Sequence, residues 1–114
     1  MPGFPKHERL LHRSDFVRIS GQGEKIHSAN FIILWERASG ETVRVGITVS
    51  GKVGNAVVRN RLKRLIREFY RLNKALFAPA DYNIIAKKGA ASLDFSALSQ
   101  ELGRVLQRLV GHPC

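Results

Sequence analysis

The segment that decides the fold is GNAVVRNRLKRLIREFYR, residues 54–71, in which a helical apolar repeat and a dense run of cations share one stretch. At 100° per residue the apolar side chains fall within about 120° of one another on a helical wheel. They are Val58, Leu62, Leu65, Ile66 and Phe69, continued by Leu72. The pattern predicts an amphipathic helix from about Ala56 to Lys74, ended before Pro79, with one face on a core and the other carrying positive charge.

The charged side of this predicted helix carries six basic residues and one acid, Glu68, which we expect to pair with Arg64. A helix face that is merely solvated usually mixes the two signs, because acid–base pairs at i,i+4 stabilise a helix and like charges destabilise it. A surface that binds a polyanion is therefore favoured over a simple solvated face. The basic residues are Arg59, Arg61, Lys63, Arg64, Arg67 and Arg71.

The residue types in this run favour nucleic acid as the polyanion. Arginine outnumbers lysine five to one between residues 59 and 71, and its planar fork of donors suits bidentate contacts with phosphates and base edges. Asn60 can both donate and accept hydrogen bonds, as contact with a base edge or a 2′-hydroxyl requires. Before the helix, Gly51 and Gly54 flank Lys52 in a segment whose backbone amides can approach a phosphate closely, although it does not match the nucleotide-binding P-loop pattern.

Composition narrows the class of protein. The 114 residues are 44% hydrophobic, with 19 Lys and Arg against 9 Asp and Glu, a formal net charge of +10. We expect a single RNA-binding domain over residues 1–114 that is monomeric by itself. Neither a spanning apolar run of ~20 residues nor a signal-peptide core is present, so we expect a cytoplasmic protein with no membrane partner. The one cysteine, Cys114, cannot form a disulfide within the chain.

The residues before the basic helix predict one helix and three strands. Ser14-Asp15 provides an N-cap for a short helix closed by Gly21. The runs at 30–37 and 42–50 predict an antiparallel hairpin, turned at Ser39-Gly40, with Val43, Val45, Ile47 and Val49 on its core face. A further short strand is expected at 24–27.

The residues after the basic helix predict a strand and a last helix. The run 81–88 contains the buried strand YNIIA and ends in Lys87 and Lys88. Ser92 or Asp94 caps a helix with one apolar stripe, which Gly111 and Pro113 end. The whole order predicts an α+β fold, in which helices pack on a small, mostly antiparallel sheet.

Several motifs together resemble the protein component of bacterial ribonuclease P. The most specific is GKVGNAVVRNRLKRLIREFYR, which is similar to that family's Arg-Asn-Arg signature on a long basic helix. RLLHRSDFVRI near the start, RVGITVS before the signature and DYNIIAKKGA after it follow in the order that the family shows. Arg-Asn-Arg alone would be a trivial tripeptide, but in this context the match is specific and covers most of the chain.

The resemblance implies a fold and a function that the residues alone do not establish. The implied fold has the order α-β-β-β-α-β-α with a left-handed βαβ crossover, against the usual right-handed rule, and is shared with a ribosomal protein domain. The implied partners are a catalytic RNA and precursor tRNA, from which the holoenzyme removes the 5′ leader. The RNA would hold the Mg²⁺ ions and perform the hydrolysis, so that the protein has no catalytic or metal-binding residue and holds no cofactor by itself.

The resemblance also implies two sets of binding residues. The contacts with the catalytic RNA would be Arg59, Asn60, Arg61, Lys63, Arg64 and Arg67. The single-stranded leader would lie in a cleft between the first helix and the sheet, against Phe16, Arg18, Lys52, Lys87 and Lys88. An aromatic face for bases beside a basic groove is the usual composition of a single-strand site. Ser20 stands where many members have a second cleft aromatic and Gly51 where a lysine is common, which predicts a thinner leader site.

Other readings of the residues remain open at this point. The nine acids and four histidines show no spacing that would hold a metal pair, which argues against a nuclease centre in the protein itself. An RNA-binding ribosomal or assembly protein without an enzymatic partner fits the composition equally well. Binding of double-stranded DNA is disfavoured, because no helix precedes the basic one in helix-turn-helix arrangement. Phe16 has a structural alternative as a buried helix residue, and Trp35 is expected in the core.

Overall fold

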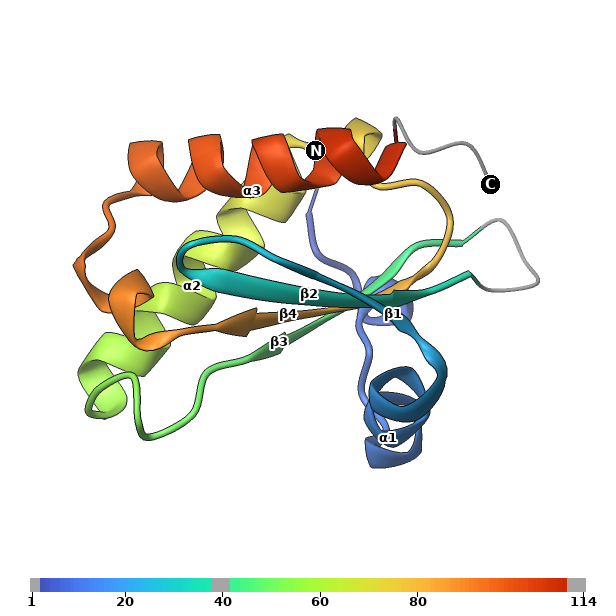
Figure 1. The fold of residues 1–114 in the computed structure, drawn as a ribbon, viewed down its shortest axis with the longest axis horizontal. Coiled ribbons are helices and arrows are strands. Elements are labelled where there is room, and N and C mark those ends of the chain that lie inside the picture. Colours follow the sequence, from blue (N-terminus) through green and yellow to red (C-terminus); the bar gives the residue numbers. More distant parts are fainter. Residues whose placement is uncertain (1–2, 38–41, 111–114) are drawn as a thin grey trace.

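The computed structural model describes residues 3–37 and 42–110. Its regular elements follow the predicted order α-β-β-β-α-β-α, with short 3-10 turns between them (Figure 1). The helices are α1 (Arg13–Gln22), α2 (Ala56–Leu72) and α3 (Phe95–Val110). The strands are β1 (Glu24–His27), β2 (Phe31–Glu36), β3 (Arg44–Thr48) and β4 (Asp81–Ala86), and the turns are η1 (Lys6–Glu8), η2 (Lys74–Leu76) and η3 (Lys88–Ser92).

The sheet has the strand order β1-β2-β4-β3. β1 pairs antiparallel with β2, and β2 with β4, whereas β3 lies parallel to β4. The predicted hairpin between 30–37 and 42–50 is therefore wrong, because β4 lies between β2 and β3; its expected turn at Ser39-Gly40 is outside the described residues. β4 is buried along nearly its whole length, and a strand with both faces covered belongs inside a sheet rather than at its edge.

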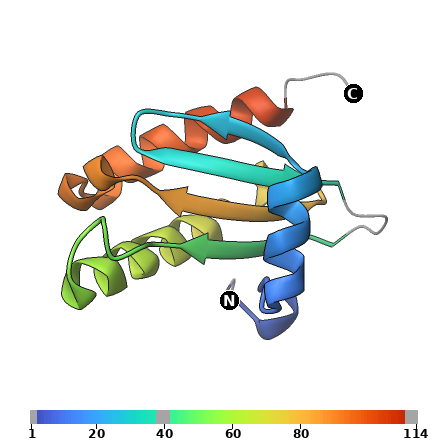
Figure 2. The ribbon, with the colours of Figure 1, turned by 60° about the horizontal axis from the view of Figure 1, so that its bottom comes forward.

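Helices cover both faces of the sheet. α2 and α3 pack on one face and α1 crosses the other (Figure 1). The connection from β3 through α2 to the adjacent parallel strand β4 is left-handed, as Figures 1 and 2 together show. The predicted crossover is confirmed, and it brings the basic helix to the sheet face opposite α1.

Residues of each strand alternate between the two faces. The larger core lies under α2 and α3 and includes Phe31, Ile33, Val45 and Ile84. A smaller cluster of Leu10, Ile19 and Leu34, with Phe16, Ile32 and Ile85 packed against it, lies under α1. This alternation confirms the predicted core face of β3 and supplies an apolar seat for α1.

The helix boundaries differ from the prediction by a few residues. α1 begins at Arg13 after His12, and neither Ser14 nor Asp15 caps it; it ends at Gln22, with Gly23 rather than Gly21 as the C-cap. α2 is capped by Asn55, whose side chain accepts a hydrogen bond from the Val58 amide at 3.0 Å. Asp94 caps α3 by accepting from the Ala97 amide at 2.8 Å, as expected.

The C-terminal turn of α2 also departs from the helical-wheel prediction. α2 ends at Leu72 instead of Lys74, and the Leu72 side chain is 54% exposed rather than part of the apolar face. Tyr70 is buried in its place and donates a hydrogen bond from its hydroxyl to Glu8. That bond lets an aromatic residue outside the predicted stripe enter the core with its polar atom satisfied.

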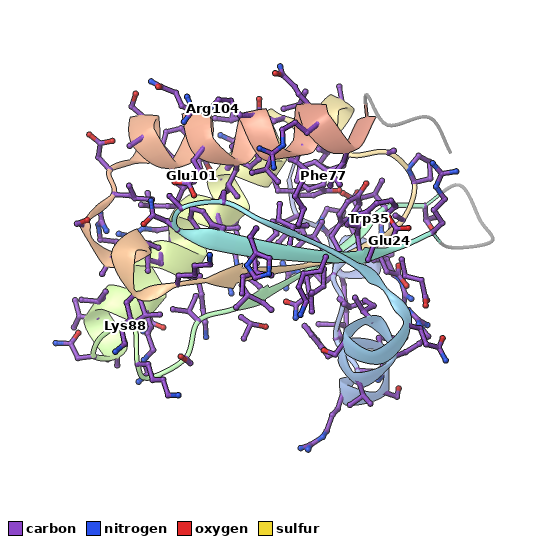
Figure 3. All side chains as sticks on the ribbon, viewed as in Figure 1. Glu24, Trp35, Phe77, Lys88, Glu101 and Arg104 are labelled. Atoms are coloured by element: carbon purple, nitrogen blue, oxygen red, sulfur yellow. The ribbon has the colours of Figure 1, made fainter. Side chains whose placement is uncertain are left out.

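The buried carboxylate of Glu101 joins α3 to the turn between β1 and β2. It accepts hydrogen bonds from the Ser28 hydroxyl, the Asn30 amide at 2.7 Å and Asn30 Nδ2 at 2.8 Å. Figure 3 shows Glu101 on the inner side of α3 and Arg104 on its outer side. Burial by itself would raise the pKa of Glu101, but the hydrogen bonds from Ser28 and Asn30 outweigh it and lower that pKa.

We predict that Glu101→Gln lowers the free energy of unfolding by about 1–3 kcal/mol at pH 7. The glutamine side chain places an N–H donor where a carboxylate oxygen now accepts hydrogen bonds from Ser28 and Asn30. Since the pKa of Glu101 is lower in the folded state, the carboxylate's contribution is complete above about pH 5, and it is lost as the pH falls below the unfolded-state pKa and through the lower folded-state pKa. Urea unfolding at pH 7 and at successively lower pH should show the gap between the two proteins closing. An equal gap at all pH values, or the same loss in the exposed-site control Glu24→Gln, would contradict this role.

Candidate nucleic-acid interface

The face of α2 turned away from the sheet carries the predicted RNA contacts. Asn60, Arg64 and Arg67 are exposed, and Lys63 is partly buried. None of these four makes an ion pair among the described residues. Their donors are therefore directed to solvent on one continuous surface, here called the α2 basic face.

Two predicted contacts on α2, Arg59 and Arg61, are partly buried, and Arg61 has a structural partner. Arg61 donates from a terminal guanidinium nitrogen to the Leu93 carbonyl at 2.6 Å, which joins α2 to the segment that precedes α3. Arg59 is partly buried, and its Nε makes no hydrogen bond within the described residues.

The expected pair between Glu68 and Arg64 is wrong, because Glu68 pairs with Arg71. Hydrogen bonds from Arg71 lower the pKa of the Glu68 carboxyl, against the opposing effect of burial.

The predicted leader residue Phe16 lies on the sheet rather than inside the core. A Cβ atom added to Gly46 would come within 2.5 Å and 2.6 Å of two Phe16 ring carbons, so the ring rests directly on the Gly46 backbone. The Phe16 side chain is half-buried, and it packs at the edge of the cluster under α1. It has an aromatic face against the sheet and an exposed portion beside it. Sequence reasoning missed Gly46, although a glycine inside an alternating strand such as RVGITVS often marks a close approach by another group.

Arg18, also predicted to bind the leader, belongs to an ion-pair network. Its guanidinium lies 2.7 Å from Glu36, 2.6 Å from the buried Asp81 and 3.2 Å from Asp15. Arg44 binds Asp81 from the other side at 2.6 Å, and hydrogen bonds to Asp81 raise the pKa of Arg44. With its charge neutralised, Arg18 fixes α1 to the sheet and is a poor candidate for a phosphate contact.

The three predicted lysines occupy the loops at one end of the sheet. Lys52 and Lys88 are exposed, whereas Lys87 donates from Nζ to the Ser28 carbonyl at 2.8 Å. Ser20 is exposed on α1, and Gly51 has open space around its Cα, so neither position supplies a cleft wall. A thinner leader site at these two positions stays a prediction.

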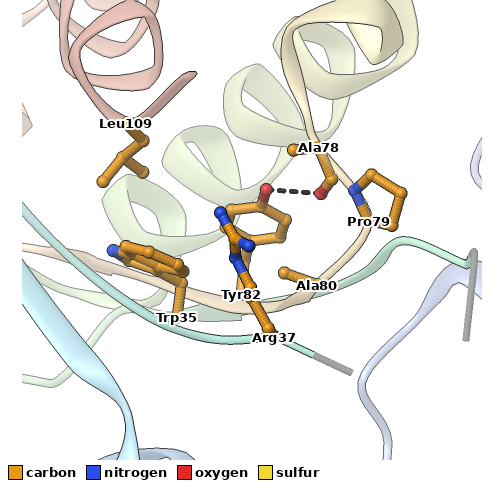
Figure 4. Close-up of a pocket in the computed structure, with 7 residues that line it drawn as sticks. All are labelled: Trp35, Arg37, Ala78, Pro79, Ala80, Tyr82 and Leu109. Carbon is orange, nitrogen blue, oxygen red and sulfur yellow. Dashed lines mark hydrogen bonds between the residues drawn. The ribbon is translucent and has the colours of Figure 1, made fainter. Parts of the chain in front are cut away.

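Trp35 lies on the face away from α1. It lines a small pocket with Tyr82, Leu109 and the segment before β4 (Figure 4). Tyr82 donates from its hydroxyl to the Ala78 carbonyl at 2.5 Å, and burial raises the pKa of Tyr82 to about 12. Trp35 packs against the larger core, which confirms its predicted structural role.

Neither a metal-binding cluster nor a membrane-spanning helix occurs in the part of the chain that the structure describes. No group of three or more His, Cys, Asp or Glu side chains in residues 3–37 and 42–110 has an arrangement for holding a metal ion. None of the helices in that part of the chain is both long and apolar enough to cross a membrane. The fold does collect Asp15, Glu36 and Asp81, which are distant in sequence, but it collects them around Arg18.

These features define a class: small basic α+β proteins in which a left-handed βαβ unit presents a cationic helix. A family model described as Ribonuclease P matches residues 4–110. The chain is 61% identical over 106 residues to the Ribonuclease P protein component of Geotalea uraniireducens, covering 93% of this chain and 94% of that one. The chain belongs to the ribonuclease P protein family.

Solved structures of family members have the same fold. The RNase P protein of Staphylococcus aureus superposes with a TM-score of 0.84 at 31% identity, over 90% of this chain and 94% of that one. The protein from Thermotoga maritima gives a TM-score of 0.82 at 33% identity, over 89% and 96% of the two chains. The reading as a ribosomal or assembly protein without an enzymatic partner is accordingly not favoured.

We predict that Arg61→Ala lowers the free energy of unfolding by about 1–2 kcal/mol, because it removes a charge-assisted hydrogen bond between two elements. Arg64→Ala, on the same helix but at an exposed position without an ion pair among the described residues, should change it by less than about 0.5 kcal/mol. Urea unfolding of both variants makes the comparison. Equal stability of the two variants would mean that Arg61 is not a structural residue.

Proposed function

We propose that this chain binds the catalytic RNA of ribonuclease P through the α2 basic face and holds the 5′ leader of precursor tRNA beside Phe16. As a ribonuclease P protein, the chain is a subunit of the enzyme that processes the 5′ end of tRNA. The observation that carries the proposal is that Asn60, Arg64 and Arg67 lie exposed and without ion pairs on one helix face, among the described residues. The chain has 19 Lys and Arg against 9 Asp and Glu, and an excess of cations that no acid of the protein neutralises favours an external polyanion.

The proposed division of labour leaves the phosphodiester hydrolysis to the RNA. The carboxylates that the fold brings together are each bound to Arg18 or Arg44. A carboxylate neutralised in this way is poorly suited to act as a general base or to attract a divalent cation. We therefore assign the Mg²⁺ ions of the holoenzyme to the RNA, and to this protein the tasks of binding and positioning, within the bacterial cytoplasm.

The two binding tasks fall on different faces of the molecule. α2 and α1 lie on opposite sides of the sheet (Figure 1), so RNA bound along α2 leaves the surface beside α1 open. Phe16 supplies a ring on which a base can stack, and Lys52 and Lys88 supply exposed charge for the backbone. A single protein can then contact the catalytic RNA and the substrate leader at once.

For the α2 basic face, we predict that the logarithm of the RNA binding constant falls linearly with the logarithm of salt concentration, because bound phosphates release counterions. Arg64→Ala and Arg67→Ala should each make the slope shallower by about 0.7–0.9, the value for one lost phosphate contact. Filter binding to the catalytic RNA over a salt series measures this. Arg108→Ala, which removes an exposed charge from α3, is the matched control; a loss equal to that of the α2 variants would make the effect one of net charge alone.

For Phe16, we predict that Phe16→Ala weakens holoenzyme binding to leader-bearing precursor tRNA by ~1–3 kcal/mol, the usual value of one stacked base. Binding of mature tRNA and of the catalytic RNA should be unchanged. Because the ring is half-buried, the stability loss should stay below the ~3–5 kcal/mol of a fully buried phenylalanine. Thermal unfolding beside the two affinities tests this, and a large stability loss without a leader-selective effect would place Phe16 in the core.

A further inference from the structure

One row of side chains crosses all four strands on the α1 side of the sheet. The strand registers pair His27 with Ile32, Ile32 with Ile85 and Ile85 with Thr48. α1 crosses the opposite end of the strands and leaves this end of the face uncovered (Figure 2). His27 is exposed and the other three are partly exposed. We call these four residues the open row.

The open row joins two aromatic rings at opposite edges of the sheet. Phe16 rests on Gly46 of β3, one row away from Thr48, and His27 stands on the edge strand β1. Three interstrand spacings of ~4.8 Å separate β3 from β1, or about 14 Å. The aliphatic side chains of Ile32 and Ile85 lie between them. Such a surface suits nucleobases, whose faces pack on apolar groups and stack on Phe and His rings.

Charge on the short strand β1 is divided between its two faces. Lys25 is exposed and pairs with Leu34, which places it on the same face as His27; Glu24 pairs with Trp35 on the face of α3. Lys87 adds a second cation here, because its Nζ donates to the carbonyl of Ser28, the residue after His27. That bond uses one of three donors on the ammonium group. The edge beside the open row is thus positive, although β1 as a whole carries an acid.

We propose that the open row extends the leader site, and that Lys25 and His27 bind a segment of single-stranded leader that continues from Phe16. The inference rests on the proposed function. Lys25 contacts a phosphate, His27 stacks on a base, and Ile32 and Ile85 form the floor between them. Stacked nucleotides advance 3.4 Å each, so about 14 Å of surface holds at most about four.

The experiment uses holoenzyme reconstituted with catalytic RNA and precursor tRNA whose leaders increase from one to about ten nucleotides. The double variant Lys25→Gln/His27→Gln is compared with Arg108→Gln, which also removes one positive charge but lies on α3, on the other side of the sheet. With long leaders the double variant should lose about tenfold in affinity, and it should bind mature tRNA as the unmodified protein does. The loss for the double variant and the loss for Phe16→Ala should each appear above a certain leader length. These two lengths should differ by no more than about four nucleotides, the number that the open row can hold.

The outcomes separate this inference from the function on which it rests. If Phe16→Ala shows a leader-selective loss and the double variant shows none at any leader length, the open row is not part of the site, while the proposed function stands. If neither variant shows one, the leader site beside α1 fails as a whole. An equal loss for mature tRNA, or a loss matched by Arg108→Gln, would reduce the effect to net charge and overturn the inference.

Discussion

The burial of β4 between β2 and β3 is the constraint on which the rest of the structure depends. A strand covered on both faces cannot stay at the edge of a sheet, so β2 and β3 do not form a hairpin although they are consecutive. β3 and β4 then lie parallel, and the chain between them must cross one face of the sheet. That crossing segment is α2. Its apolar stripe is buried on the sheet for this reason, and its basic face is left toward solvent.

The same constraint sorts the arginines into two groups with opposite roles. Asp81 begins β4 and is buried, so its charge requires partners, and Arg18 and Arg44 provide them. The pairs hold α1 across the sheet and seat Phe16 on Gly46. Removing one partner from such a buried group costs far more than an exposed pair does. The arginines of the α2 basic face have no comparable partners in the described residues, which leaves them available to RNA under the proposed function.

Much of the fold could be predicted because its signals are local. The 3.6-residue repeat of α2, the alternation along β3 and the capping Asp94 each lie within one element, where hydrogen bonding and side-chain direction follow directly from the sequence. The motifs also carried the resemblance that predicted the left-handed crossover. For the candidate site, the exposed members Asn60, Arg64 and Arg67 could be recognised for the same reason, since a helix with one apolar face must turn its charged face outward.

The sequence by itself determined the helices, the strands, the excess of positive charge and the family. Only the tertiary structure decided the position of β4 in the sheet and the separate partners of Arg18 and Arg61. It also decided the contact of Phe16 with Gly46 and the open row beside it. Each of these depends on residues far apart in the chain, such as Arg18 and Asp81 or His27 and Ile85. No local pattern records which strand lies next to which. That order is decided by the burial that all elements achieve together, because the free energy gained by covering both faces of β4 exceeds what a local hairpin would supply.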